Sequence, residues 1–97
     1  MFRHVVLFNW TEGATGAQQD ALAAELRKLP AVIDTIREYH VGPDAGINPA
    51  NCDFAVVADF DDSDGYLAYR DHPAHRAAVK NYVDPIVARR SAVQYQL

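Results

Sequence analysis

The sequence predicts an α+β fold whose strands and helices follow the order β-α-β-β-α-(α)-β. Three observations predict it. Residues 5–8 and 54–58 are apolar at every position, which is typical of central strands that are covered on both faces. Leucines at positions 22, 26 and 29 repeat with helical spacing. Pro73 divides a later segment into two short helices, since proline is favoured at the first position of a helix.

The N-terminal part is predicted to form a strand and then a helix. The strand covers residues 2–10, and a turn at 11–14 follows it. Thr15 and Gln18 have the spacing of a capping box, which places the start of the helix here. The three leucines make this helix amphipathic, and Pro30 marks its end.

Two further strands are predicted in the middle of the chain. The second strand covers residues 35–41 and ends at Gly42 and Pro43. The loop after it, at 44–51, is rich in Gly, Asn and Pro. The third strand covers residues 53–60 and contains the second fully apolar run.

The C-terminal part is predicted to hold two helices and the last strand. Asp62 or Ser63 caps a helix over 64–71, a second helix runs over 73–83, and a strand follows over 91–97. The complete order is that of the ferredoxin-like βαββαβ sandwich, with a four-stranded antiparallel sheet.

Length and composition limit the class of protein. The 97 residues are expected to form a single domain, residues 1–97. The net charge of −4, with scattered basic residues, argues against binding to nucleic acid or to an anionic membrane surface. Cys52 is the single cysteine, which excludes an internal disulfide and fits a reducing compartment. No leader pattern or membrane-spanning run is recognised, so we expect a cytoplasmic protein.

The two strands that are apolar on both faces predict a partner subunit. Helices of a four-stranded sheet of this order cover one face only, whereas the first and third strands are apolar on both faces. A second copy of the same sheet is the simplest cover, so we expect a homodimer that encloses a shared core or cavity. The alternative is that long loops or the third helix cover that face.

Tyr69 and His75 are the expected catalytic residues. His75 shares a predicted helix face with Val79 and Tyr82 that points into the protein, and the helix N-terminus there disfavours the charged imidazolium. A neutral His75 can accept a proton, and Tyr69 can hold or protonate a carbonyl oxygen. Each also has an ordinary structural interpretation, as a packed histidine and a core tyrosine. His72, at the corner between the helices, is expected to support the turn.

His4 is the polar residue of the first strand, on the same face as Val6 and Phe8. Its burial there costs about 1–3 kcal/mol unless it is hydrogen-bonded, so we expect it to have a partner, a water or a ligand. No metal or cofactor site is predicted. The four histidines lack zinc spacing, the acidic residues after the third strand lack calcium-loop spacing, and no glycine-rich phosphate loop is present.

Three segments resemble a known family. HVVLFNW at 4–10, FAVVADF at 54–60 and YRDHPAH at 69–75 together resemble the stress-responsive A/B barrel (Dabb) family, and His-Pro-x-His is the specific part. The resemblance covers nearly the whole chain. It implies a dimeric α+β barrel made of two ferredoxin-like units, in agreement with the homodimer argued above.

One branch of this family implies roles for single residues. Olivetolic acid cyclase-like polyketide cyclases close a ring by an intramolecular aldol reaction, and their motif implies that Tyr69 and His75 are catalytic. His4, Phe54 and His72 are then the expected ligand-binding residues. Phe54 stands where that branch has a further pocket histidine, so we expect a less polar pocket and do not assume the same substrate.

The sequence leaves three functions open. The first is a small cofactor-free enzyme of the cyclase or lyase type. The second is a non-catalytic barrel that binds a hydrophobic or aromatic small molecule or protects other proteins under stress. The third is a cofactor-free monooxygenase of the same architecture, which Trp10 and the other aromatic side chains would suit.

Overall fold

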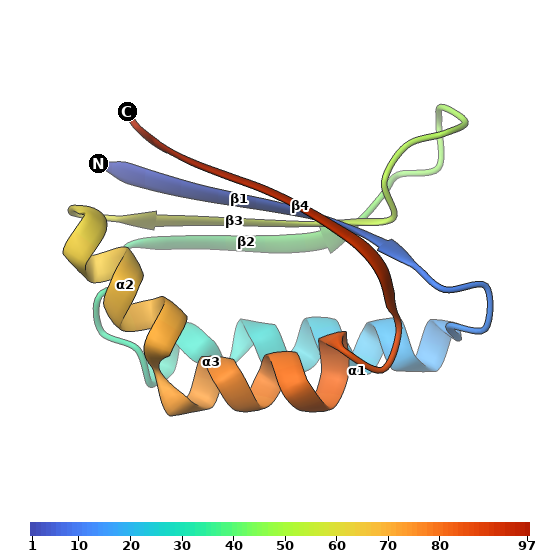
Figure 1. Ribbon diagram of the computed structural model, residues 1–97, viewed down its shortest axis with the longest axis horizontal. Helices are drawn as coiled ribbons and strands as arrows, with labels where there is room; N and C mark the ends of the chain where they lie inside the picture. Colours follow the sequence, from blue (N-terminus) through green and yellow to red (C-terminus); the bar gives the residue numbers. More distant parts are fainter.

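A four-stranded antiparallel sheet with all its helices on one face forms this protein (Figure 1). The computed structural model describes residues 1–97. The elements are β1 (Phe2–Trp10), α1 (Gly16–Arg27), η1 (Leu29–Ala31), β2 (Glu38–Pro43), β3 (Phe54–Phe60), α2 (Ser63–Asp71), α3 (Pro73–Ala78), η2 (Val79–Val83) and β4 (Val87–Gln96). The ferredoxin-like fold predicted from the sequence is confirmed.

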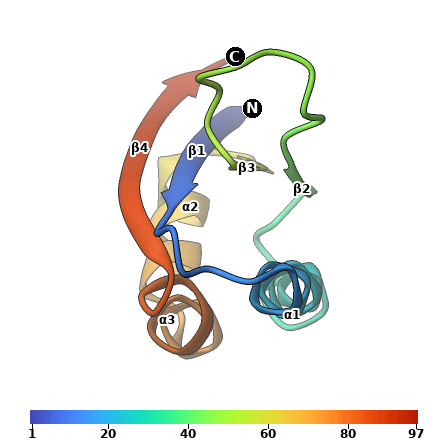
Figure 2. The same ribbon diagram turned by 90° about the vertical axis from the view of Figure 1, so that its right-hand side faces the viewer.

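The strand order is β2-β3-β1-β4, so β1 and β3 are the two central strands. Their register runs antiparallel from the pair Phe2 and Phe60 to the pair Phe8 and Phe54. Figure 2 shows α1 and α3 side by side below the sheet, with α1 nearer β2 and α3 nearer β4. None of the helices is long and apolar enough to cross a membrane.

The hydrophobic core lies between the sheet and these helices. The capping box at Thr15 is present, with Thr15 Oγ1 accepting from the Gln18 backbone N–H at 3.1 Å. The leucines that predicted α1 are all buried, as are the alternate residues of β1 and β3 that face the helices. Burial of this apolar surface is the main favourable contribution to the stability of the fold. The largest fully buried side chains are Phe54, Phe60, Leu22 and Ile86.

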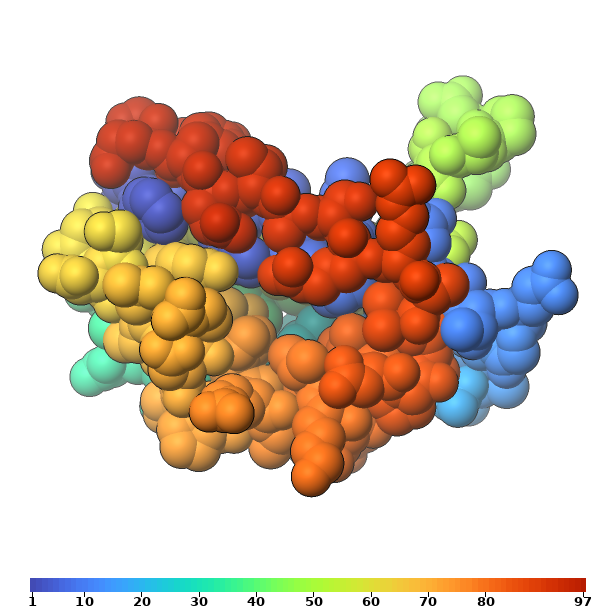
Figure 3. Space-filling view, in the orientation of Figure 1, coloured from blue at the N-terminus to red at the C-terminus, as the bar shows by residue number.

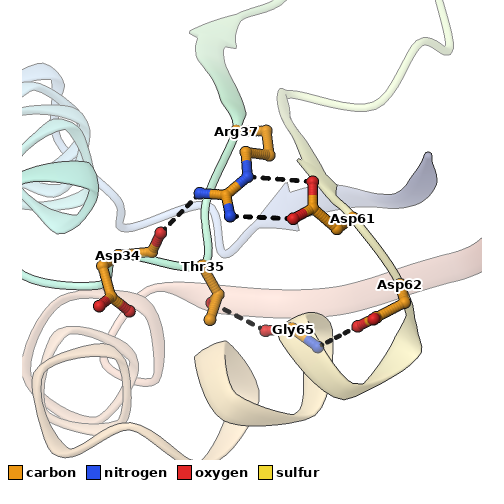
Figure 4. Close-up of polar contacts among 6 residues, drawn as sticks. All are labelled: Asp34, Thr35, Arg37, Asp61, Asp62 and Gly65. Carbon is orange, nitrogen blue, oxygen red and sulfur yellow. Dashed lines mark hydrogen bonds and ion pairs between the residues drawn. The ribbon is translucent and has the colours of Figure 1, made fainter.

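The second strand begins at Glu38 rather than at residue 35, because the residues before it make other contacts (Figure 4). Arg37 donates two hydrogen bonds to the carboxylate of Asp61, at 3.0 and 2.9 Å. Thr35 Oγ1 donates to the carbonyl oxygen of Gly65 at 2.9 Å. These bonds connect residues 35 and 37 to the segment from the end of β3 to the start of α2. A single backbone hydrogen bond, from the Arg37 N–H to the carbonyl oxygen of Asp59 at 2.8 Å, joins this segment to β3 before β2 begins.

The helix after Pro73 is not α-helical throughout. It is α-helical to Ala78 and then continues as the π-helical turn η2, in which the backbone N–H of Asp84 donates to the carbonyl oxygen of Val79 at 2.9 Å. The fourth strand starts at Val87, earlier than the predicted residue 91, and pairs with the end of β1 across a register shift at Asn9 and Trp10.

Candidate functional site

A cavity of about 180 Å³ lies between the sheet and the α3–η2 segment. Its apolar lining comes from both central strands, α1, η2 and β4, and its polar lining consists of His4, Tyr69, His75, Asp84 and Arg90. Figure 3 shows the surface hollowed between β4 and α3 on the face that this view presents. An apolar cavity with a few converging polar groups is the usual form of a small-molecule site.

His75 stands in the first turn of α3, and its Nδ1 lies 3.1 Å from the backbone carbonyl oxygen of Arg70. A carbonyl oxygen only accepts, so Nδ1 carries the proton and Nε2 has the free lone pair. Burial lowers the pKa of His75, against the hydrogen bond to Arg70, which raises it, and the charge of Arg90 lowers it further. The imidazole is therefore neutral at pH 7, and burial is the main cause.

Tyr69 is 2% exposed, and its ring lies against that of His75 with centroids 4.2 Å apart. The Tyr69 hydroxyl forms a 3.0 Å hydrogen bond with the hydroxyl of Tyr39 on β2. Burial raises the pKa of Tyr69 well above its usual value and raises that of Tyr39 to about 12. Both hydroxyls therefore stay protonated, and when Tyr39 donates to Tyr69, the Tyr69 proton is not used in this bond.

His4 is 3% exposed and has the partner that its burial requires. Gln94 Nε2, across the β1–β4 pair, donates to His4 Nδ1 at 2.8 Å. Burial lowers the pKa of His4 to about 4, and the charges of Arg90 and His75 act in the same direction. His4 is neutral at pH 7 and presents Nε2–H as a donor.

The structure thus brings His4, Tyr69 and His75 around one cavity and places Phe54 and His72 elsewhere. Phe54 is buried beside Trp10, with ring centroids 5.7 Å apart, and does not line this cavity. His72 caps α3, since its Nδ1 accepts the backbone N–H of Ala74 at 3.0 Å.

The cavity-facing side of the helix that follows Pro73 also differs from the sequence prediction. Val79 lines the cavity with His75, but Val83 takes the place that regular α-helical spacing assigned to Tyr82. The π-helical turn η2 is the cause, because it adds one residue to the turn after Val79. The same turn brings Asp84 to the cavity.

Sequence reasoning missed Tyr39, Arg90 and Gln94 as residues of this site. Their roles depend on strand register: Gln94 lies opposite His4, Arg90 lies opposite Phe8, and Tyr39 lies opposite Ala58. The sequence signal that could have located Arg90 and Gln94 is the alternation along β4, which puts residues 90, 92, 94 and 96 on one face of the sheet. No group of three or more His, Cys, Asp or Glu side chains is placed to hold a metal ion.

Comparison with known proteins agrees with this fold. A profile of the Stress responsive A/B Barrel Domain matches residues 2–97. An uncharacterized protein of Streptomyces coelicolor is 33% identical over 81 residues, which are 81% of this chain and 84% of that protein.

Two solved structures show the same architecture. The crystal structure of a dimeric ferredoxin-like protein of unknown function from Thermobifida fusca is 46% identical, with a TM-score of 0.92 over 99% of this chain and 90% of that one. A hydroxynitrile lyase from Passiflora edulis is 18% identical, with a TM-score of 0.85 over 99% of this chain and 92% of that one, and shares the fold. The family profile spans nearly the whole sequence, and this chain therefore belongs to the stress-responsive A/B barrel (Dabb) domain family.

Proposed function

We propose that this protein is a cofactor-free enzyme that removes a proton next to the carbonyl group of a small, largely apolar ligand held in the cavity. In its most specific form the reaction is a polyketide-type ring closure by intramolecular aldol addition. His75 is the proposed base, Tyr69 the proposed donor to the carbonyl oxygen, and His4 a ligand-binding residue. Phe54 and His72 have no contact with the cavity and are left out of the proposed site.

The observation that carries the proposal is the environment of His75. Its Nδ1–H is bound to the Arg70 carbonyl oxygen, which fixes the ring and leaves Nε2 as the basic nitrogen. The lowered pKa keeps that nitrogen unprotonated near pH 7, which a general base requires. A histidine with only a packing role needs neither feature.

The proposed reaction balances within the ligand. Nε2 of His75 takes a proton from the carbon next to one carbonyl group, and that C–H electron pair becomes an enolate. The enolate carbon then bonds to a second carbonyl carbon of the same molecule, whose oxygen becomes an alkoxide. This alkoxide receives the proton back from His75, while Tyr69 stabilises the developing oxyanion by hydrogen bonding.

The proposal includes a homodimer formed through the open face of the sheet. On this face Leu7 is 37% exposed, Val93 54% and Tyr95 42%. A stable interface buries about 800 Å² on each partner, and these exposed apolar side chains on β1 and β4 are candidates for its core. The Thermobifida fusca relative is described as dimeric, which supports the same assembly here.

A second candidate is a non-catalytic receptor for a hydrophobic or aromatic small molecule. One observation favours it: the Tyr69 hydroxyl is bonded to Tyr39 rather than to His75. In this case the cavity binds its ligand, and both tyrosines only support the core.

The test is proton exchange. The protein is incubated in heavy water with aryl ketones such as phenylacetone, and deuterium uptake next to the carbonyl group is followed by NMR. We expect His75→Ala to reduce the enzyme-dependent rate by about 10²–10⁴-fold while the melting temperature stays nearly unchanged. Glu12→Ala is the control, because Glu12 is exposed in the turn after β1 and does not line the cavity.

Two results would contradict the catalytic proposal. One is a His75→Ala protein that is destabilised and still exchanges at the wild-type rate. The other is ligand binding without any exchange in the wild-type protein, which would favour the receptor. A linear polyketide thioester then tests the ring closure itself, with the cyclic product identified by mass and NMR.

A further inference from the structure

Arg90 is the only permanently charged cation among the residues that line the cavity. It lies on β4 opposite Phe8, so it shares the helix-covered face of the sheet with His4 and Gln94. None of the ion pairs of the chain involves Arg90, and Asp84, the one acid of the lining, is not paired with it. The lining of the cavity therefore includes an exposed arginine, Arg90, that is in no ion pair.

The field of this guanidinium reaches the rest of the site. Burial is the first cause of the low pKa of His4 and His75, and the charge of Arg90 lowers the pKa of both as well. Both imidazoles are neutral near pH 7, so they do not add a second positive charge. Arg90 is then the one positive charge of the lining and Asp84 the one negative charge.

The surface beside the cavity is also basic. An open groove on the α3–η2 surface shares His75, Val79 and Asp84 with the cavity, and its other side chains include Arg76 and Lys80, neither of which is in an ion pair. The net charge of the whole chain is −4, so this basic region is local. Such a region raises the rate at which anions arrive.

We propose that the ligand of the cavity carries an anionic oxygen group, a carboxylate or a phosphate, which binds Arg90 while the apolar body of the ligand fills the cavity. This inference rests on the proposed function, because it takes the cavity as the ligand site. Arginine offers two parallel N–H donors to such a group, which adds orientation to affinity. The anion is held at the β4 side, and the apolar body lies toward His75, Tyr69 and the central strands.

The experiment compares ligands that share a benzyl body and differ in the head group. Phenylacetate, benzyl phosphate, benzyl alcohol and benzylamine are titrated into the wild-type protein by calorimetry, and the affinities are repeated for Arg90→Gln. Arg89→Gln is the matched control, because Arg89 is the adjacent residue of β4, lies opposite Asn9 and faces the other side of the sheet. Chemical shifts of the His4 and His75 ring protons report whether the ligand enters the cavity.

We expect one or both anions to bind at least tenfold more tightly than benzyl alcohol, and benzylamine to bind least. Arg90→Gln should reduce the affinity for the preferred anion about 10–100-fold, as expected for a hydrogen-bonded charge pair, and leave benzyl alcohol unchanged. Arg89→Gln should behave as the wild type. The better of phenylacetate and benzyl phosphate identifies the head group.

The remaining outcomes overturn the inference in distinguishable ways. If benzyl alcohol binds as well as the anions, or if Arg90→Gln and Arg89→Gln have equal effects, the anion inference is wrong and the proposed function stands. If no compound perturbs His4 or His75, the cavity is not the ligand site, and both the inference and the proposed function fail.

Discussion

The two faces of the sheet each bury one polar side chain, His4 on the helix-covered face and Asp59 on the open face, and both are 3% exposed. His4 has a neutral partner, Gln94, and a cavity beside it. Asp59 has a charged partner, because Arg3 donates to both of its carboxylate oxygens at 2.7 Å. That pairing lowers the pKa of Asp59.

The difference between the faces indicates that one face leaves room for a ligand and the other is left uncovered by its own chain. The helix-covered face is closed by its own chain, and what remains is a small space lined by groups with perturbed pKa values, which is suited to a ligand. The open face has only an open groove beside Leu7 and the 44–52 loop, and it exposes large apolar side chains around a fixed ion pair. Such a surface fits a partner protein, and the ion pair restricts how that partner can be oriented.

The largest expected effect is on assembly. Val93→Lys places a charge on the open face of the edge strand β4, opposite Val5 of the central strand β1. We expect sedimentation or light scattering at micromolar concentration to change from two copies to one, because an unpaired charge in an apolar interface is strongly unfavourable. Leu67→Lys is the control, since Leu67 lies on α2 and is similarly exposed. A Val93→Lys protein that stays dimeric would show that the open face is not the dimer interface.

The next effect is on stability. Asp59→Ala leaves Arg3 without its carboxylate and removes both 2.7 Å hydrogen bonds. We expect the melting temperature to fall by several degrees, because the partner of a removed group is left unsatisfied. Asp61→Ala is the comparison, since its ion pair with Arg37 is exposed and should contribute less. Equal losses of melting temperature in the two variants would show that the Arg3–Asp59 pair contributes no more to stability than the exposed Arg37–Asp61 pair.

The cavity predicts a pH dependence of stability. Burial lowers the pKa of His4 from 6.5 to about 4, so below pH 6.5 the unfolded state binds a proton that the folded state does not. Stability is then full above pH 6.5 and is lost as the pH falls toward 4. We expect unfolding free energies measured by denaturant to decrease from pH 7 to pH 5, and less steeply in His4→Gln. An unchanged slope in His4→Gln would contradict the assignment.

The smallest expected effect concerns Tyr39, a positioning residue that acts through Tyr69. Tyr39→Phe removes the 3.0 Å hydroxyl–hydroxyl bond and keeps the ring. A hydrogen bond contributes about 1 kcal/mol, so we expect kcat to fall about fivefold with KM nearly unchanged. Tyr82→Phe is the control, since Tyr82 does not line the cavity. A change confined to the melting temperature would favour the receptor over the enzyme.

The sequence was sufficient for the fold because its local signals agree with the tertiary structure. The apolar runs of β1 and β3, the capping box at Thr15 and the corner at Pro73 each specify an element without distant information, and all are present. The helix-facing position of His4 also followed from simple alternation along the strand.

The remaining features depend on contacts between distant residues. His4 and Gln94 are ninety positions apart in the chain, and the Tyr39–Tyr69 bond joins two elements separated by β3. No local sequence pattern predicts such distant residue pairs, because they depend on strand register. The π-helical turn has no clear sequence signal either, and it accounts for the exchange of Tyr82 for Val83 at the cavity.

The π-helical turn η2 affects which residues of β4 face the cavity. A π-turn contains one residue more than an α-helical turn of similar rise, and β4 follows η2 after only three residues. Deletion of the exposed Lys80 would let this turn close as an α-helical turn of similar rise, so β4 could keep its register. The π-helical turn thus absorbs one residue that would otherwise shift β4 by one position and exchange its two faces, which would take Arg90 away from the cavity. The presence of Arg90 at the cavity therefore depends on the geometry of one helical turn as well as on the sequence of β4.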